Sequence, residues 1–205
     1  MAGSKLRGTG AALAVLSLLA ATAMAQTAPP MRVRGTIASI DGQNLTVTAR
    51  DGATVPIKLA ADYAVTAVVK ADMSDIAVGK YVGIAAMPQG SDAEKALEVL
   101  VFPEAARGSG EGHYPWDLAP GSMMTNATIA QAVDKVDGRN LTLKHKDGET
   151  QIAVPQDVPI VTFAPGDRSL LMPGAGIMVS VVKQPDGTMT ASRVLVGKDG
   201  VKPPM

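Results

Sequence analysis

A twelve-residue stretch of the chain occurs twice, and this repeat limits the possible folds more than any other feature. Residues 41–52 read DGQNLTVTARDG and residues 137–148 read DGRNLTLKHKDG, with seven of twelve positions identical. Further matches follow in the same order at nearly the same spacing, which chance does not produce. The chain therefore carries two copies of one unit, at 32–102 and 128–197.

Each unit has the pattern of short strands separated by turns. In the first, Leu45, Val47 and Ala49 alternate with threonines, which is typical of a half-buried strand. Asp-Gly pairs on both sides of this strand indicate hairpin turns. Strands are predicted at 33–40, 45–49, 55–59, 63–69, 81–86 and 96–102, with one helical turn within 72–79.

Six short strands in about 70 residues would leave exposed edges in an open sheet, so closure into a small barrel is favoured. The sequence predicts an all-β fold of two tandem OB-like barrels, each with five to six strands, joined by an irregular linker. Because a unit of this size buries little apolar surface, we expect the two units to pack on each other. A flat two-layer sandwich is the alternative.

The first twenty-five residues have the features of a signal peptide. Lys5 and Arg7 precede an apolar run at 11–21, and Ala23-Met24-Ala25 fits a cleavage site that would leave Gln26 as the mature N-terminus. The run is shorter than the roughly 20 residues of a membrane span; an uncleaved anchor is the alternative. The chain has no cysteine, which favours a bacterial periplasm over a disulfide-rich secreted class. We expect a periplasmic protein with no membrane span after cleavage.

Charge and motifs exclude several classes of function. Removing Lys5 and Arg7 leaves seventeen basic and nineteen acidic residues, so nothing suggests nucleic-acid binding. Without cysteine there is neither a thiolate metal site nor a cysteine nucleophile. The chain contains no Gly-x-Ser-x-Gly, His-Glu-x-x-His or phosphate-loop motif. The sequence predicts a protein that is not an enzyme and has no cofactor.

Residues 103–127 form a linker outside both copies, and it carries the main candidate site. Its glycines and prolines predict neither helix nor strand. It contains the only tryptophan of a chain that is 3% aromatic, within the run EGHYPWDL. His113, Tyr114, Trp116 and Asp117 are candidate contacts for a ligand or partner; alternatively, they pack the linker between the units. Glu111, His113 and Asp117 are weak candidates for a metal site, since such a site normally needs a further ligand.

Two other features have simple structural interpretations. His145 lies between Lys144 and Lys146, so alternation predicts that it faces inward and is half-buried; its counterpart in the first copy is Ala49. Of the nine methionines after residue 25, only Met123 and Met124 lie close in sequence. This spacing favours core filling over binding of copper. Residues 198–205 form a C-terminal tail.

The repeated strand followed by Val-Asp-Gly-x-x-Leu-Thr-Val and Asp-Gly resembles an exported bacterial family of OB-like repeats catalogued as a domain of unknown function. The copies depart from this motif at one position each, Ile40 in the first and Leu143 in the second. This resemblance covers both copies, and it implies a fold more than an activity because its motif consists of turn and strand residues. Whole-length relatives with a similar His-x-Pro-Trp-Asp linker are sometimes labelled metal transporter permeases. This chain departs from that label, because a permease needs several membrane-spanning helices.

These observations lead to one functional prediction and two alternatives. The chain is predicted to be a non-catalytic periplasmic binding or adaptor protein, with an unknown protein or small-molecule partner in the cell envelope. The first alternative is periplasmic handling of a metal such as copper. The second is a hydrolase of envelope material, which would require polar groups converging in a pocket.

Overall fold

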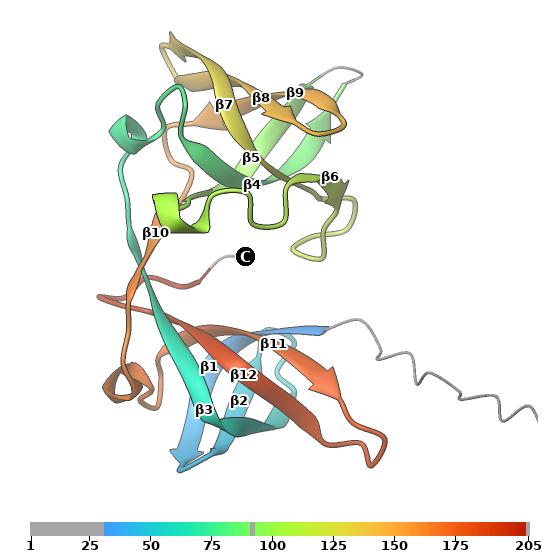
Figure 1. Ribbon diagram of the computed structural model, residues 1–205, viewed down its shortest axis with the longest axis vertical. Coiled ribbons are helices and arrows are strands. Elements are labelled where there is room, and N and C mark those ends of the chain that lie inside the picture. The colour runs from blue at the N-terminus through green and yellow to red at the C-terminus, as the bar shows by residue number, and fades with distance from the viewer. Residues whose placement is uncertain (1–30, 91–92, 204–205) are drawn as a thin grey trace, which may run out of the picture.

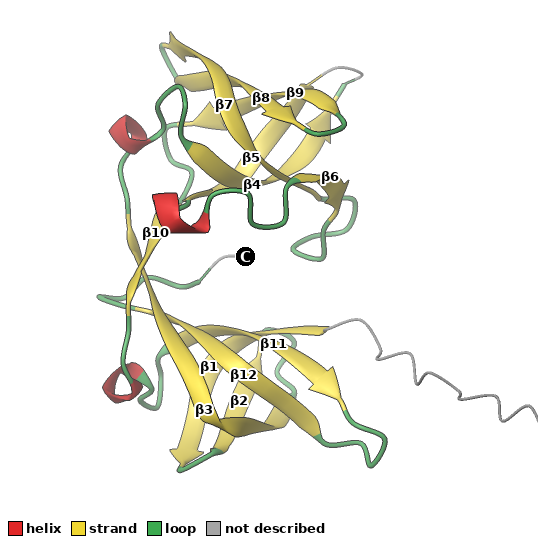
Figure 2. Cartoon of the chain, viewed as in Figure 1, coloured by secondary structure: helices red, strands yellow, loops and turns green. Residues whose placement is uncertain are grey.

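The computed structural model describes residues 31–90 and 93–203. The predicted signal peptide at 1–25 and the predicted mature N-terminus, Gln26, lie outside the described residues. Within them the chain is all-β, as predicted, with twelve strands and three single-turn 3-10 helices (Figure 2). None of these helices is long and apolar enough to cross a membrane.

The strands follow one another along the chain in this order: β1 (Met31–Asp41), β2 (Asn44–Ala49), β3 (Thr54–Lys70), β4 (Tyr81–Gln89), β5 (Ala93–Val101), β6 (Gly112–Pro115), β7 (Met123–Lys135), β8 (Gly138–His145), β9 (Gly148–Pro155), β10 (Ile160–Pro165), β11 (Gly176–Lys183) and β12 (Met189–Gly197). The 3-10 helices are η1 (Met73–Asp75), η2 (Glu104–Ala106) and η3 (Arg168–Leu170).

Ten of the strands form two closed rings of five (Figure 1). Ring A has the order β12-β11-β1-β2-β3 and is closed by parallel pairing of β12 with β3. Ring B has the order β5-β4-β7-β8-β9 and is closed by parallel pairing of β5 with β9. Each ring encloses its own apolar core, in which alternate residues of the repeated strand are buried: Leu45 and Val47 in ring A, Leu141 and Leu143 in ring B.

The two rings interleave the two copies of the repeat, which differs from the predicted contiguous units at 32–102 and 128–197. Ring A combines β1, β2 and β3 of the first copy with β11 and β12 of the second. Ring B combines β7, β8 and β9 of the second copy with β4 and β5 of the first. The sequence repeat predicts which segments correspond to each other, whereas the pairing of strands far apart in sequence decides which ring each of them joins.

The chain passes from one ring to the other along β3 and β10, which cross between the rings (Figure 1). At this crossing the two copies exchange their last two strands. Residues 55–59 and 63–69, predicted as two strands, form the single 17-residue strand β3, whose C-terminal end pairs with β10. A third apolar cluster lies at this crossing. Val68, Leu100 and Val161 are buried there, and Phe102 packs edge-on against Phe163 with ring centroids 5.9 Å apart.

The same Asp-Gly pair occupies different places in the two hairpins. In the first copy Asp41 pairs with Asn44, so Gly42 and Gln43 make the turn. In the second copy the turn moves to Val136 and Asp137, because β7 and β8 continue pairing as far as Lys135 and Gly138. The β7–β8 hairpin is therefore longer, and its tip residue Val136 is 99% exposed.

The linker at 103–127 is more regular than its composition predicts. It contains η2 and the short strand β6, which pairs antiparallel with the start of β7. A tight turn follows, in which the Ser122 amide donates to the Ala119 carbonyl at 3.0 Å. Pro120 and Gly121, with a φ of 77° at Gly121, have the residue types and conformation of a type II turn. Glycine and proline therefore shape the turn without preventing strand pairing beside it.

Candidate binding site around the linker

Strand β6 fixes the linker on ring B, with help from one side chain of β7. The Asn126 amide donates to the carbonyls of Ser109 and Gly110, at 3.3 and 3.1 Å, and to Tyr114 Oη at 3.0 Å. Tyr114 Oη in turn donates to the Gly110 carbonyl at 3.3 Å. Tyr114, predicted as a contact residue, therefore serves first to hold the linker in shape.

Beyond β6 the linker reaches ring A and contacts β1. Asp117 accepts a hydrogen bond from Arg34 Nη2 at 2.7 Å and a longer one from Arg32 Nη1 at 3.5 Å. The Arg32 guanidinium lies 3.8 Å from the centroid of the Trp116 ring, close enough for a cation–π interaction. Arg32, Arg34, Trp116 and Asp117 are called the crease cluster below, because they connect the linker on ring B to ring A.

Charge pairing stabilises the ionised form of Asp117. Partial burial alone would raise the pKa of its carboxyl group, but the hydrogen bond from Arg34 and the charges of Arg34 and Arg32 outweigh that effect. The pKa of Asp117 consequently lies below its ordinary value. Arg34 is the buried member of the pair, with 8% of its side chain exposed, whereas Asp117 is 46% exposed.

Ring B contributes a buried carboxyl group to the same region. Glu98 of β5 is 2% exposed, and burial raises its pKa to about 8, although the positive charges of Arg34 and Arg50 act in the opposite direction. At neutral pH most of the Glu98 side chains are therefore protonated. Asp117 is left as the ionised partner of the arginines of β1.

A second group of polar side chains gathers at one end of the interior of ring B. His113 of β6 lies with Nε2 3.6 Å from Glu94 Oε1, and its ring stacks on that of His145 with centroids 6.0 Å apart. His113 Nδ1 contacts Thr125 Oγ1 at 2.9 Å, and His145 Nε2 contacts Thr150 Oγ1 at 3.1 Å. These five residues are called the histidine cluster. His145 is half-buried, as predicted.

The histidine cluster contains a carboxylate, an imidazole and a hydroxyl group in the sequence of contacts found in a catalytic triad, but the hydroxyl group is not accessible to a substrate. Glu94, His113 and Thr125 follow one another as carboxylate, imidazole and hydroxyl, yet Thr125 is 0% exposed, so a substrate cannot reach its oxygen. Burial raises the pKa of Glu94, and the nearby His113 opposes that shift. The arrangement thus holds polar groups in place without presenting a nucleophile.

The weak metal candidates do not converge. His113 faces Glu94, whereas Asp117 is held by the arginines of ring A. Glu111 lies near Tyr81 instead, where its charge adds to the burial that raises the pKa of Tyr81. Among the described residues, no group of three or more His, Cys, Asp or Glu side chains is placed to hold a metal ion.

Buried polar atoms without hydrogen-bond partners concentrate around the linker. In the described part of the chain there are six such side-chain atoms, and three belong to the crease cluster or to the neighbouring Glu98: Arg34 Nε, Glu98 Oε1 and Trp116 Nε1. The others are Glu94 Oε2, His145 Nδ1 and Asn126 Oδ1. Native proteins satisfy most buried polar groups, so a concentration of unpaired ones marks a place that calls for a functional explanation.

The sequence located the linker residues but not their partners. It predicted one site from His113, Tyr114, Trp116 and Asp117; the structure divides them between the histidine cluster, the linker core and the crease cluster. Glu98 was not predicted from the sequence. Its signal was nevertheless visible: Glu98 is the only carboxylate in the apolar run 96–102, and a charge in such a run is notable because burying it is costly.

Comparison of the chain with family models, with curated proteins and with solved structures returned no match.

Proposed function

We propose that this protein is a non-catalytic binding or adaptor protein of the bacterial periplasm, and that it binds its ligand in the crease between the rings. The single observation that supports this most is the concentration of unpaired buried polar atoms at Arg34, Glu98 and Trp116. A region evolved only for packing would be expected to satisfy or remove such groups.

The proposal includes an OB-like origin for both rings. In ring A the order β1-β2-β3-β12-β11, closed back to β1, has five strands, with η3 directly before β11 and its Leu170 packed against the core of this ring. Such small barrels commonly bind ligands through the strands and loops of one face. The copies would share the barrel scaffold, while the unduplicated linker would supply the ligand contacts.

Trp116 is the only tryptophan of the chain, so its fluorescence reports directly on the crease. The test titrates the purified mature protein with the small-molecule fraction of a periplasmic extract and follows Trp116 emission. A second arm places a photo-crosslinking amino acid at Leu118 in cells, with Val136 at the exposed β7–β8 tip as the control position.

A saturable change in emission, or a discrete crosslinked product from Leu118 that is absent from Val136, would support the proposal. Emission that does not respond to the extract, together with equal crosslinking at the two positions, would overturn it. In that case the linker would serve only to pack the rings together.

A further inference from the structure

A small cavity opens beside the crease cluster, on the side of ring A. Its volume is about 250 Å³, and it is lined by the middle of β1, the end of β2, the start of β11 and the C-terminal tail. At about 30 Å³ per water molecule in the liquid, this space suits a compact ion with a few waters. It is smaller than the usual 300–1,000 Å³ of sites for drug-sized molecules.

Positive charge dominates the lining of this cavity. Arg34, Arg50 and Lys202 line it together with Thr36 and Thr48, and none of its lining residues is acidic. The Arg50 backbone amide donates to the Arg34 carbonyl at 3.1 Å, which holds the backbones of the two residues side by side. A larger cavity of about 660 Å³ is also lined in part by the tail, but there Asp72 and Asp157 balance Lys70 and Lys202.

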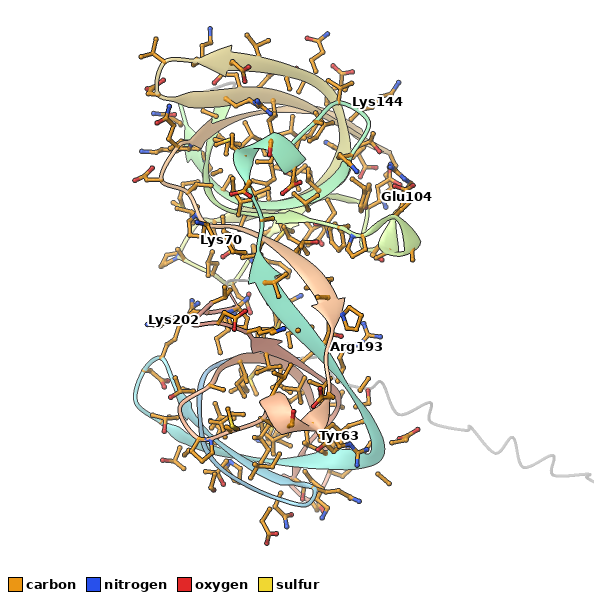
Figure 3. The ribbon with its side chains drawn as sticks, turned by 90° about the vertical axis from the view of Figure 1, so that its left-hand side faces the viewer. Tyr63, Lys70, Glu104, Lys144, Arg193 and Lys202 are labelled. Atoms are coloured by element: carbon orange, nitrogen blue, oxygen red, sulfur yellow. The ribbon has the colours of Figure 1, made fainter. Side chains whose placement is uncertain are left out.

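The tail that carries Lys202 is anchored in place. The Lys198 amide donates to the Val68 carbonyl at 2.9 Å, and Pro203 is buried. Figure 3 shows Lys202 at the level between the two rings. The cavity is therefore lined by three strands and an anchored tail.

These cationic side chains have positive charge and hydrogen-bond donors that no group of the described residues pairs with. Arg34 donates from Nη2 to Asp117. Its Nε has no hydrogen-bond partner, even though more than nine-tenths of the residue is buried and water cannot readily take that place. Among the described residues, neither Arg50 nor Lys202 has a carboxylate oxygen within 4.0 Å. Glu98 does not compensate for this charge, because burial raises its pKa to about 8 and keeps it mostly neutral at pH 7.

The corresponding place in ring B lacks this arrangement. Strand pairing makes Asn126 the equivalent of Arg34, since Arg34 pairs with Met178 and Asn126 with Gly83, at matching positions of the duplicated strands β11 and β4. Asn126 is neutral, and its amide nitrogen already donates to linker groups. The concentration of cations is thus specific to ring A.

We propose that this cavity binds a compact oxyanion, a phosphate or carboxylate group, between Arg34, Arg50 and Lys202. Guanidinium and ammonium groups bind such oxygens through charge-assisted hydrogen bonds, and arginine matches their geometry with two parallel donors. The inference rests on the proposed function, for which it names the class of ligand. The bound anion would be either free phosphate or an organic acid that binds through its carboxylate groups.

The test measures binding of inorganic phosphate and of citrate to the full mature protein by calorimetry, at constant ionic strength set with chloride. Arg50→Gln and Lys202→Met remove cavity charges without touching the Asp117 contact. Lys146→Gln is the matched control, because Lys146 occupies the place of Arg50 in the second copy. We expect saturable binding of at least one probe, weakened about tenfold by either cavity variant and unchanged by the control.

Binding of phosphate alone would assign the site to phosphate groups, and binding of citrate alone would assign it to carboxylates. Failure of both probes to bind beyond the chloride background would overturn the inference, as would equal binding by wild type and both cavity variants. If Trp116 still responded to the periplasmic fraction in that case, the proposed binding function would stand and only the anion class would be wrong.

Discussion

At the scale of single residues, Glu98 has the strongest consequence for stability. Its pKa is about 8 in the folded chain against a usual value of 4.5. The folded state therefore binds more protons than the unfolded state between these values, and stability falls as pH rises through this range. The stabilisation is fully present below pH 4.5 and is lost by about pH 8. From the size of the pKa shift, the loss is at most about 5 kcal/mol.

We predict that Glu98→Gln makes the free energy of unfolding less dependent on pH between 5 and 8 and stabilises the protein at pH 8. Urea unfolding of both proteins at several pH values measures this directly. Every other titrating group, including Glu94 and Asp117, is common to both, so the difference between the two curves isolates Glu98. Parallel curves would show that Glu98 does not titrate in this way.

The Arg34–Asp117 pair provides a second test at this scale. Because Asp117 is 46% exposed, solvent screens the interaction, and we expect a coupling energy of about 1 kcal/mol from a double-mutant cycle of Arg34→Met and Asp117→Asn. The exposed Glu104–Arg107 pair is the control and should give a smaller value. Asp117→Asn should also change Trp116 emission. Equal coupling in the two pairs would mean that burial of Arg34 adds nothing.

At the scale of elements, the crossing of β3 and β10 depends on the small apolar cluster of Val68, Leu100 and Val161. Leu100 is 0% exposed, so Leu100→Ala should leave a cavity and lower the free energy of unfolding by about 2–5 kcal/mol. Val136→Ala, at the exposed hairpin tip, should change it by less than about 0.5 kcal/mol. Urea unfolding compares the two. A small effect of Leu100→Ala would show that the crossing contributes little stability.

Individual strands were predictable from the sequence, but their partners were not. Alternation around Leu45 and Leu141 is a local signal, and it identified strands that the structure contains. The continuity of β3 was missed because residues 60–62 read as a break. In the second copy, Pro155 ends β9 at the corresponding place and β10 begins separately. Pro155 and Pro159 lie on both sides of the break in the second copy, and neither has a backbone donor, whereas residues 60–62 of the first copy contain no proline.

The same reasoning applies to the candidate site. The sequence could identify the aromatic linker, because unusual composition is visible without a structure. It could not bring Glu94 to His113 or Arg34 to Asp117, since these contacts join strands and linker segments that lie far apart along the chain. The exchange of β4 and β5 into ring B is what places Glu94 and Glu98 on the ring that carries the linker.

At the scale of the whole molecule, the interleaving of the rings makes them one folding unit. Each half of the chain supplies three strands to one ring and two strands to the other. Neither half contains a complete ring, so the halves should not unfold independently. We expect a single cooperative transition in calorimetry, with equal calorimetric and van't Hoff enthalpies. Two transitions would indicate that each copy folds separately.

Cutting the chain between Pro120 and Gly121 tests the interleaving most directly. These two residues are exposed at the tip of a turn, so a protease site inserted there should be cleaved without disturbing either ring. One fragment then carries β1 to β6 and the other β7 to β12, and both rings need strands from both fragments. The nicked protein should elute as one species of unchanged size in gel filtration and separate into two fragments only in denaturant. If the fragments separated under native conditions as two folded species, each copy would have to form its own ring, contrary to the strand pairing described above.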